Sequence, residues 1–252
     1  MIEHPHDLVK QLFFEWKGCQ PQKLDALPLS GSDRRYFRLS ADNESVIAVF
    51  NSDIKENKAF LAFSKSFADV NLSVPKILAQ SKNELVYLQE DLGDITLFAH
   101  LSEVRKKNGW TNSLTELYKK VLSSLPAFQL CKGVDYNLCY PRSAFDLQSM
   151  KWDLSYFKYY FLKLAKIPFD EQLLENDFDT FTNFLLEAKS DFFLYRDFQS
   201  RNIMLKNNEI FFIDYQGGRK GALQYDLASL LWDAKANIPN DVRQELLKHC
   251  LS

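Results

Sequence analysis

The 252-residue sequence has few cysteines, and they are not arranged as in a disulfide or metal framework. Cys19, Cys131, Cys139 and Cys250 include no Cys-x-x-Cys pair, and they do not combine with the four histidines at metal-ligand spacings. Secreted domains that depend on disulfides carry denser, paired cysteines. The pattern predicts buried thiols in a reducing compartment, and we expect a cytoplasmic protein.

An excess of charge of one sign is also absent. Acidic residues number 33 and basic residues 31, so no strong field points to nucleic acid or to an anionic membrane as a partner. No stretch approaches the length of a membrane-spanning helix. The N-terminus lacks a basic segment, and its apolar run at Leu12-Phe13-Phe14 is too short for a signal peptide. We therefore expect neither a nucleic-acid partner nor a membrane partner.

Aromatic residues are abundant, with 21 Phe and 11 Tyr, and they predict a densely aromatic core. A chain of this length can bury a large core, as one extended domain or as two lobes. The first 90 residues combine strand and helix patterns. Helices are predicted over 7–17 and 54–70, and strands over 23–29, 35–39, 46–50, 76–78 and 85–89.

Beyond Gly93 the apolar periodicity becomes mainly helical. The order of strands, helix and strands before that point predicts an antiparallel N-terminal sheet, so the expected fold class is α+β. Helices are predicted over 97–107, 113–130, 144–166, 171–188, 225–235 and 241–250.

Three oxygen-bearing side chains, Asp197, Asn202 and Asp214, form the most informative pattern of the chain. Residues 202–213 predict a β-hairpin with a turn at 206–208, which would bring Asp197 and Asn202 at its start beside Asp214 at its end. Each residue alone is typical of a turn or a cap. Together they suit phosphoryl transfer, in which one carboxylate orients the acceptor hydroxyl while a carboxamide and a second carboxylate hold magnesium.

These residues stand in the segments YRDFQSRN and IDYQGG, which resemble the catalytic loop and the metal-binding aspartate of the protein-kinase-like fold. The segment YDLASLL over 225–231, and the absence of an Ala-Pro-Glu motif, are similar to the aminoglycoside phosphotransferase and choline kinase family. Residues 27–39, 74–80 and 88–93 add a similarity to its bacterial sugar kinases, which phosphorylate the anomeric hydroxyl of N-acetylmuramate and N-acetylglucosamine.

The resemblance, which runs from about residue 27 to 231, implies a bilobal kinase-like fold. A small antiparallel-sheet N-lobe would occupy residues 1–90 and a larger, mainly helical C-lobe residues 91–252. ATP and Mg²⁺ would be required. Members of the family usually continue with more helices after the last motif, which leaves open a C-terminal truncation and a further domain in the native protein.

By resemblance, Asp197 is the catalytic residue and takes the proton of the acceptor hydroxyl, while Asn202 and Asp214 are the metal ligands. Arg196 is expected to brace the loop. Asp226 is expected to accept backbone N–H groups of the catalytic loop; its local alternative is a helix N-cap.

Nucleotide contacts are expected at two places in the N-terminal part. Glu90 to Leu92 would form the hinge that hydrogen-bonds the adenine edge, although a strand-to-helix turn ending in Gly93 fits the same residues. Gly31 and Ser32 lie in a loop between two strands, where a phosphate-covering loop belongs, and a plain hairpin turn would use them too. Arg35 follows at a position that could face the phosphates or solvent.

The sequence departs from the kinase pattern on its third strand. Kinases carry a lysine there that pairs the α- and β-phosphates with a helix glutamate, whereas residues 46–51 contain no lysine. Arg35, Lys55 and Lys58 are the candidates for a replacement. Glu56 would correspond to the helix glutamate, although a solvated surface side chain is the favoured interpretation.

The acceptor is expected between the catalytic loop and the helix at 144–166. Trp152 suits the C–H surface of a sugar, and Lys151 suits a lactyl carboxylate, although such an aromatic stripe is more often core. A sugar of cell-wall recycling is the favoured acceptor. An aminoglycoside or an amino alcohol such as choline, and a non-catalytic nucleotide-binding module, remain alternatives.

Overall fold

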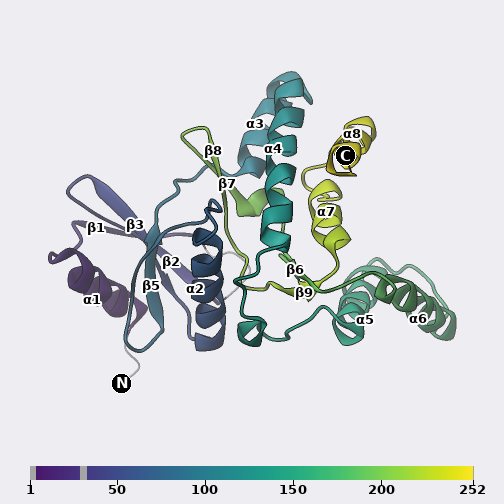
Figure 1. Cartoon of the computed structure of the whole chain (residues 1–252), viewed down its shortest axis with the longest axis horizontal. Helices are drawn as coiled ribbons and strands as arrows, with labels where there is room; N and C mark the ends of the chain where they lie inside the picture. Colours follow the sequence, from purple (N-terminus) through teal and green to yellow (C-terminus); the bar gives the residue numbers. More distant parts are fainter. Residues whose placement is uncertain (1–3, 29–32, 252) are drawn as a thin grey trace.

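The computed structural model describes residues 4–28 and 33–251, and its N-terminal lobe is built on an antiparallel sheet (Figure 1). The strands run in the order β1-β2-β3-β5-β4, and each pairs antiparallel with its neighbours. This arrangement, followed by a helical C-terminal part, confirms the predicted α+β fold class. The strands are β1 (Lys23–Ala26), β2 (Arg35–Ala41), β3 (Glu44–Phe50), β4 (Ile77–Gln80) and β5 (Val86–Glu90).

Two helices cover the opposite faces of this sheet (Figure 1). Helix α1 (Pro5–Lys17) begins with a proline, which suits the first helical turn, and ends at Gly18, whose φ of 80° is left-handed. Helix α2 (Ile54–Ala68) begins at Asp53, whose carboxylate accepts hydrogen bonds from the first free backbone N–H groups. Because side chains alternate along a strand, each helix packs on one set of strand residues.

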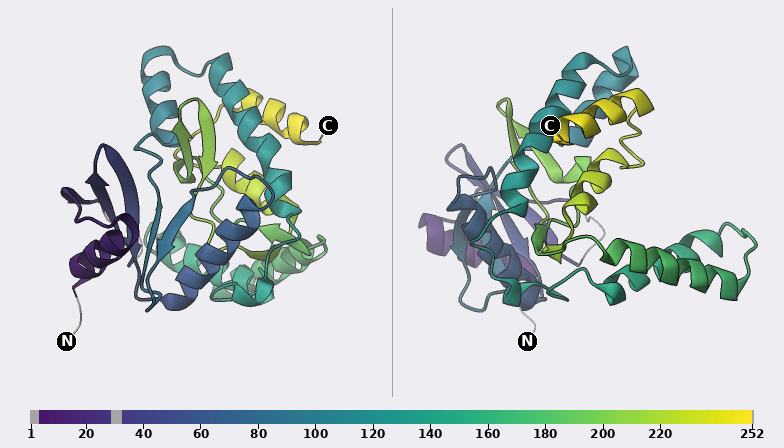
Figure 2. Two further views of the ribbon diagram at one scale, coloured as in Figure 1. Left: turned by 60° about the vertical axis from the view of Figure 1, so that its left-hand side comes forward. Right: turned by 45° about the vertical axis from the view of Figure 1, so that its right-hand side comes forward.

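The C-terminal lobe contains two groups of helices. α3 (Leu97–Asn108), α4 (Asn112–Gln129), α7 (Leu223–Leu231) and α8 (Asn240–Leu251) surround its core. Helices α5 (Leu147–Phe157) and α6 (Glu171–Leu186) project away from it as a hairpin (Figure 2). We call residues 147–186 the α5–α6 hairpin. None of the helices in the described ranges is long and apolar enough to cross a bilayer.

The predicted helix over 144–166 is wrong in its bounds. Asp146 caps α5 by accepting a hydrogen bond from Ser149 N, so the helix begins only at Leu147. Ala144 instead forms an isolated bridge with Lys220. The far end widens into a π-helical turn, Lys158–Leu162.

Two short sheets carry the loops of the C-terminal lobe. β6 (Phe192–Leu194) pairs with β9 (Arg219–Gly221), and β7 (Ile203–Lys206) pairs with β8 (Glu209–Phe212). The second pair is the predicted hairpin. Its turn residues Asn207 and Asn208 have φ angles of 52° and 67°, which is typical of the tight two-residue turn that matches strand twist.

Candidate active site

A cleft of about 540 Å³ lies between the two lobes. Asp197, Asn202 and Asp214 all line it, so the structure brings together the three residues that the sequence singled out. The N-terminal lobe supplies the opposite wall. The other residues that line the cleft are Arg34, Tyr36, Phe60, Tyr87, Gln89, Arg201, Ile213 and Gln216.

The β7–β8 hairpin produces this convergence. Ile203 pairs with Phe212, which places the start of the hairpin beside its end. Ile213 N donates a hydrogen bond to Asn202 O at 3.0 Å, and the Tyr195 hydroxyl donates to Ile213 O at 2.7 Å. The backbone therefore fixes the distance between the catalytic loop and Asp214 independently of any ligand.

The two candidate metal ligands are held by their own hydrogen bonds. Asn202 donates through Nδ2 to Asp197 O at 2.9 Å, which leaves Oδ1 as the atom that can ligate a cation. Asp214 Oδ1 accepts a hydrogen bond from Gln216 Nε2 at 2.7 Å. Two oxygen ligands suit magnesium, which keeps several waters and also binds substrate phosphates. No larger group of His, Cys, Asp or Glu placed for a metal ion occurs within residues 4–28 and 33–251.

Two residues of this site have a strained backbone. Arg196 and Asp214 have φ angles of 80° and 68°, values in the left-handed region that non-glycine residues rarely adopt. Such strain persists only where the surroundings enforce it, and it is typical of functional sites. The sequence gives no local reason, such as glycine, for either conformation.

Tyr215 follows Asp214 and joins the two lobes. Its ring stacks on Phe60 of α2 with centroids 4.9 Å apart and planes 5° apart. Phe60 in turn stacks on Tyr87 of β5 at 5.1 Å. The Tyr215 hydroxyl and Ser64 share a buried hydrogen bond of 2.6 Å. The position of Asp214 is therefore coupled to α2 and to the sheet.

The Asp197 carboxyl lies in a partly desolvated position. Burial, and then the charge of Asp214, raise the pKa of Asp197 above its ordinary value, while Arg196, Arg201 and Arg219 oppose this change. A raised pKa makes the carboxylate a better proton acceptor at neutral pH, as long as it stays ionised. The site is thus suited to taking a proton from a hydroxyl held beside Asp197.

Asp226 anchors the catalytic loop from the core. Its carboxylate accepts hydrogen bonds from Tyr195 N at 2.9 Å, from Arg196 N at 3.0 Å and from Gln129 Nε2 at 3.2 Å. The residue lies inside α7, which begins at Leu223, so the N-cap alternative is wrong. Burial raises the pKa of Asp226 to about 6, and these three donors limit the rise.

Arg196 connects the same loop to the α5–α6 hairpin. Its Nη1 and Nη2 donate to the two carboxylate oxygens of Asp153 at 2.8 and 2.9 Å, and Nη1 also donates to the Tyr225 hydroxyl at 2.6 Å. The guanidinium lies between the rings of Phe145 and Tyr225. A paired, stacked arginine of this kind is held in one orientation.

Arg34, a buried arginine that the sequence did not single out, lines the cleft on the side of the N-terminal lobe. Arg34 is 2% exposed, and its Nη2 lies 3.0 Å from Glu56 Oε1. Its Nη1 lies 3.9 Å from Asp214 Oδ1. Asn51 Nδ2 also donates to Glu56, at 2.7 Å. The interpretation of Glu56 as a solvated surface side chain is therefore wrong.

The three predicted replacements for the strand lysine lie elsewhere. Arg35 is exposed and is absent from the lining of the cleft. Lys58 pairs with Glu84 at 3.0 Å, and the Lys55 ammonium lies over the ring of Tyr140. None of the three lines the cleft, so a contact with the phosphates stays a prediction for each of them.

The strand period could have identified the correct arginine. Phe37, Leu39 and Ala41 of β2 are buried beneath α1, and Arg35 shares their face because side chains two apart point the same way. Arg34 and Tyr36 point to the opposite side from these residues, and both line the cleft. The alternation of side chains along β2 was therefore the signal that distinguishes Arg34 from Arg35.

The other predicted nucleotide contacts are not seen in the cleft. Glu90 forms an ion pair with Lys206 at 2.8 Å, and Lys206 Nζ also donates to Asp91 O. Leu92 is buried. Neither Glu90 nor Leu92 lines the cleft, so their adenine contact stays a prediction, as does the role of Gly31 and Ser32, which lie outside the described residues.

The predicted acceptor residues lie outside the lining of the cleft. Lys151 pairs with Asp179 of α6 at 2.9 Å, and Trp152 is half-exposed beneath the guanidinium of Arg142. Their contact with a sugar stays a prediction. The helix presents Asp153 to the catalytic loop instead.

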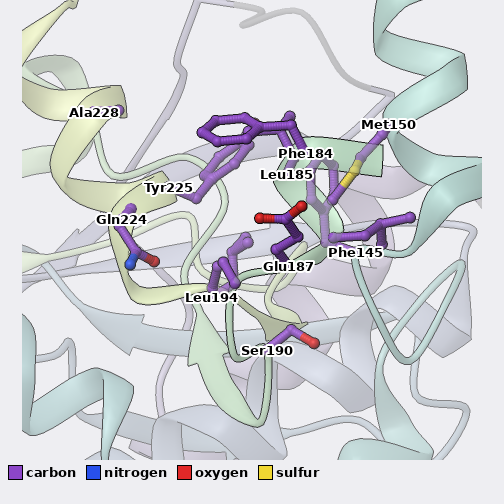
Figure 3. Close-up of a pocket in the computed structure, with 13 residues that line it drawn as sticks. Phe145, Met150, Phe184, Leu185, Glu187, Ser190, Leu194, Gln224, Tyr225 and Ala228 are labelled. Atoms are coloured by element: carbon purple, nitrogen blue, oxygen red, sulfur yellow. The ribbon is translucent and has the colours of Figure 1, made fainter. Parts of the chain in front are cut away.

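A second, apolar cavity of about 570 Å³ lies behind the catalytic loop (Figure 3). Phe145, Met150, Phe184, Leu194 and Tyr225 contribute to its wall. Tyr225 and Phe145 are also the rings over which the Arg196 guanidinium lies.

Comparisons with known proteins agree with this geometry. Residues 25–249 match the phosphotransferase enzyme family. The chain is 27% identical over 229 residues to an N-acetylmuramate/N-acetylglucosamine kinase of Pseudomonas aeruginosa, a match that spans 89% of this chain and 64% of that protein. A Neisseria meningitidis protein of the same name is 28% identical over 207 residues, spanning 80% and 58%. The chain thus spans less than two-thirds of these curated relatives.

Solved structures show the same fold at lower identity. An ADP-bound aminoglycoside phosphotransferase, APH(2'')-Ib, superposes with a TM-score of 0.68 at 17% identity, over 93% of this chain and 79% of that one. Choline kinase LicA from Streptococcus pneumoniae gives a TM-score of 0.67 at 15% identity, over 99% and 81%. At these identities the likeness shows the fold alone, and it confirms the predicted kinase-like architecture.

Proposed function

The chain belongs to the phosphotransferase enzyme family, and we propose that it transfers the γ-phosphoryl group of ATP to a hydroxyl of a small molecule. The observation that carries the proposal is the meeting of Asp197, Asn202 and Asp214 on one cleft. The strained backbone at Asp214 and the two anchors of Arg196 support it, because they hold these groups in place without a ligand.

In the proposed reaction the acceptor oxygen attacks the γ-phosphorus, the bond to the β–γ bridging oxygen breaks, and ADP leaves. Asp197 orients the hydroxyl and takes its proton, which its raised pKa favours. Asn202 and Asp214 are the residues that would hold magnesium. When bound, the ion offsets negative charge on the phosphate oxygens.

An amino sugar is our favoured acceptor. The support is the function of the two curated relatives, which are both N-acetylmuramate/N-acetylglucosamine kinases. The aminoglycoside phosphotransferase and choline kinase structures support the fold without favouring their own acceptors. We place the reaction in the cytoplasm, where ATP is available, and the four free cysteines suit a reducing compartment.

A coupled assay of ADP release on a panel of sugars and amino alcohols tests the proposal. We expect turnover with an N-acetylated amino sugar, and Asp197→Asn should lower kcat by about 10²- to 10⁴-fold. Asp191→Asn is the matched control, because Asp191 is an exposed aspartate six residues earlier on the same segment. ATP binding without turnover on any acceptor would instead support a non-catalytic module.

A further inference from the structure

The side chain of Arg34 is buried, and not all of its donors are satisfied. It is 2% exposed; its Nε makes no hydrogen bond with any of the described residues, and its Nη2 is ion-paired with Glu56 without hydrogen-bond geometry. A buried donor without a partner costs free energy, about 1–3 kcal/mol, and more when the group is charged. The cost is explained when the donors meet a ligand that the free protein does not contain.

The surroundings of Arg34 fix its direction. Glu56 Oε1 lies 3.0 Å from Nη2, and Glu56 is itself held by Asn51, the residue that follows β3. The guanidinium also lies 6.0 Å from the ring centre of Phe60, a second residue of α2. The acidic partner thus comes from α2, and the guanidinium faces the cleft in which Asp214 lies.

The charges of the cleft require a cation on this wall. Asp197 and Asp214 would repel the polyphosphate of a nucleotide, and the basic residues that line the cleft are Arg34 and Arg201. Arg201 is exposed and belongs to the catalytic-loop wall, in the 3₁₀ turn Ser200–Asn202. Arg34 is the basic residue on the opposite wall.

We propose that Arg34 binds the phosphates of the nucleotide, in place of the lysine that the third strand of this chain lacks. The inference rests on the proposed kinase function and names the residue that receives its anionic substrate. A guanidinium presents several N–H donors in one plane and matches phosphate oxygens in pairs. Asn51 and Glu56 position it, so the end of β3 contributes indirectly through a hydrogen-bonded relay.

Calorimetric titration of ATP into the purified chain tests the inference without an acceptor. We expect Arg34→Gln to weaken ATP binding by about 10- to 100-fold, the effect of losing a hydrogen bond to a charged group. Arg35→Gln is the matched control, because it removes the same charge from the adjacent residue, which is exposed and does not line the cleft; its affinity for ATP should stay within about twofold. Adenosine, measured as a competitor of bound ATP, should bind both variants like the parent.

The outcomes separate the two proposals. Unchanged ATP affinity in Arg34→Gln would overturn the role of Arg34 while leaving the kinase proposal standing. A parent protein that binds no nucleotide would overturn the kinase proposal itself. Equal weakening of ATP and adenosine would also overturn the inference, because it indicates a collapsed cleft and not a lost phosphate contact. Arg34→Lys, which keeps the charge beside Glu56, should recover part of the lost affinity and rules out misfolding as the cause.

Discussion

Two regions of this protein use the same kinds of aromatic residue in opposite ways. Around the catalytic loop, rings interlock in the interior: Phe67 meets Phe128, Phe193 and Tyr215 with centroids about 5 Å apart. On the α5–α6 hairpin, five of the six residues over 156–161 are aromatic and exposed. They are Tyr156, Phe157, Tyr159, Tyr160 and Phe161, and each is at least 42% exposed.

The difference shows what the interior rings do for function. They pack around Tyr195, which opens the catalytic loop, and around Tyr215, which follows Asp214. Close packing of these two rings restricts the movement of the site. On the hairpin the rings stack only in exposed pairs along the helix, Tyr156 on Tyr160 and Phe157 on Phe161. The hairpin contacts the catalytic loop through the ion pair between Asp153 and Arg196. The interior rings hold the site in place by close packing, and the hairpin holds it through the ion pair between Asp153 and Arg196.

The largest expected effect is a difference in the free energy of unfolding between variants of the interior rings and variants of the α5–α6 hairpin. Phe67→Ala should lower the free energy of unfolding by about 3–5 kcal/mol, because it leaves a cavity among four rings. Phe161→Ala, the matched change on the hairpin, should alter it by less than about 0.5 kcal/mol, since the side chain is already 53% exposed. Urea unfolding of both variants measures the difference. Equal losses would mean that the hairpin face is buried in solution.

A smaller effect is expected where the regions meet. Asp153→Asn removes the bidentate partner of Arg196 and should lower kcat by about tenfold, because the catalytic loop loses one of its two anchors. Stability should change by less than about 1 kcal/mol, as for other partly exposed pairs. Asp179→Asn, which breaks the pair with Lys151 on the same hairpin, is the control and should leave kcat unaltered.

The smallest effect concerns the anchor on the interior side. Because the folded pKa of Asp226 is raised to about 6 from 3.8, its protonated form favours the folded state. That stability is complete below the unfolded pKa and is lost as pH rises through about 6, so Asp226 should destabilise the chain by about 1 kcal/mol between pH 5 and pH 7. Unfolding of the parent and of Asp226→Asn at both pH values measures it. The same pH dependence in the variant would exclude Asp226 as its source.

Local patterns were sufficient for much of the fold. The helices α1 and α2, the β7–β8 hairpin and the order of strands follow from apolar period, caps and turn residues. The bounds of α5 did not follow, because Asp146 caps a helix that the apolar pattern had extended to Ala144. The hairpin's exposure could not be predicted either, since a stripe of aromatic residues gives no information about its partner.

Some residues of the candidate site could likewise be predicted from the sequence, and others could not. Asp197, Asn202 and Asp214 were predictable because a hairpin joins them within eighteen residues of sequence. Arg34 lies far from them in the chain and was not predicted; the alternation of side chains along β2 was the one signal that could have identified it. The chemistry of Lys151 did not reveal its partner in the fold: the lysine, which suits a carboxylate, pairs here with Asp179.

The stacked rings of Tyr87, Phe60 and Tyr215 set the distance between the two lobes at this point. Atoms in contact lose about a quarter to a half of their attraction when a gap of about 0.5–1 Å opens between them, so the stacked rings oppose a separation of the lobes at this point. We expect nucleotides to enter along the open mouth of the cleft without spreading its back. A synthetic inhibitor that extends inward from the mouth would meet a wall at Phe60, and its selectivity would have to come from the rim.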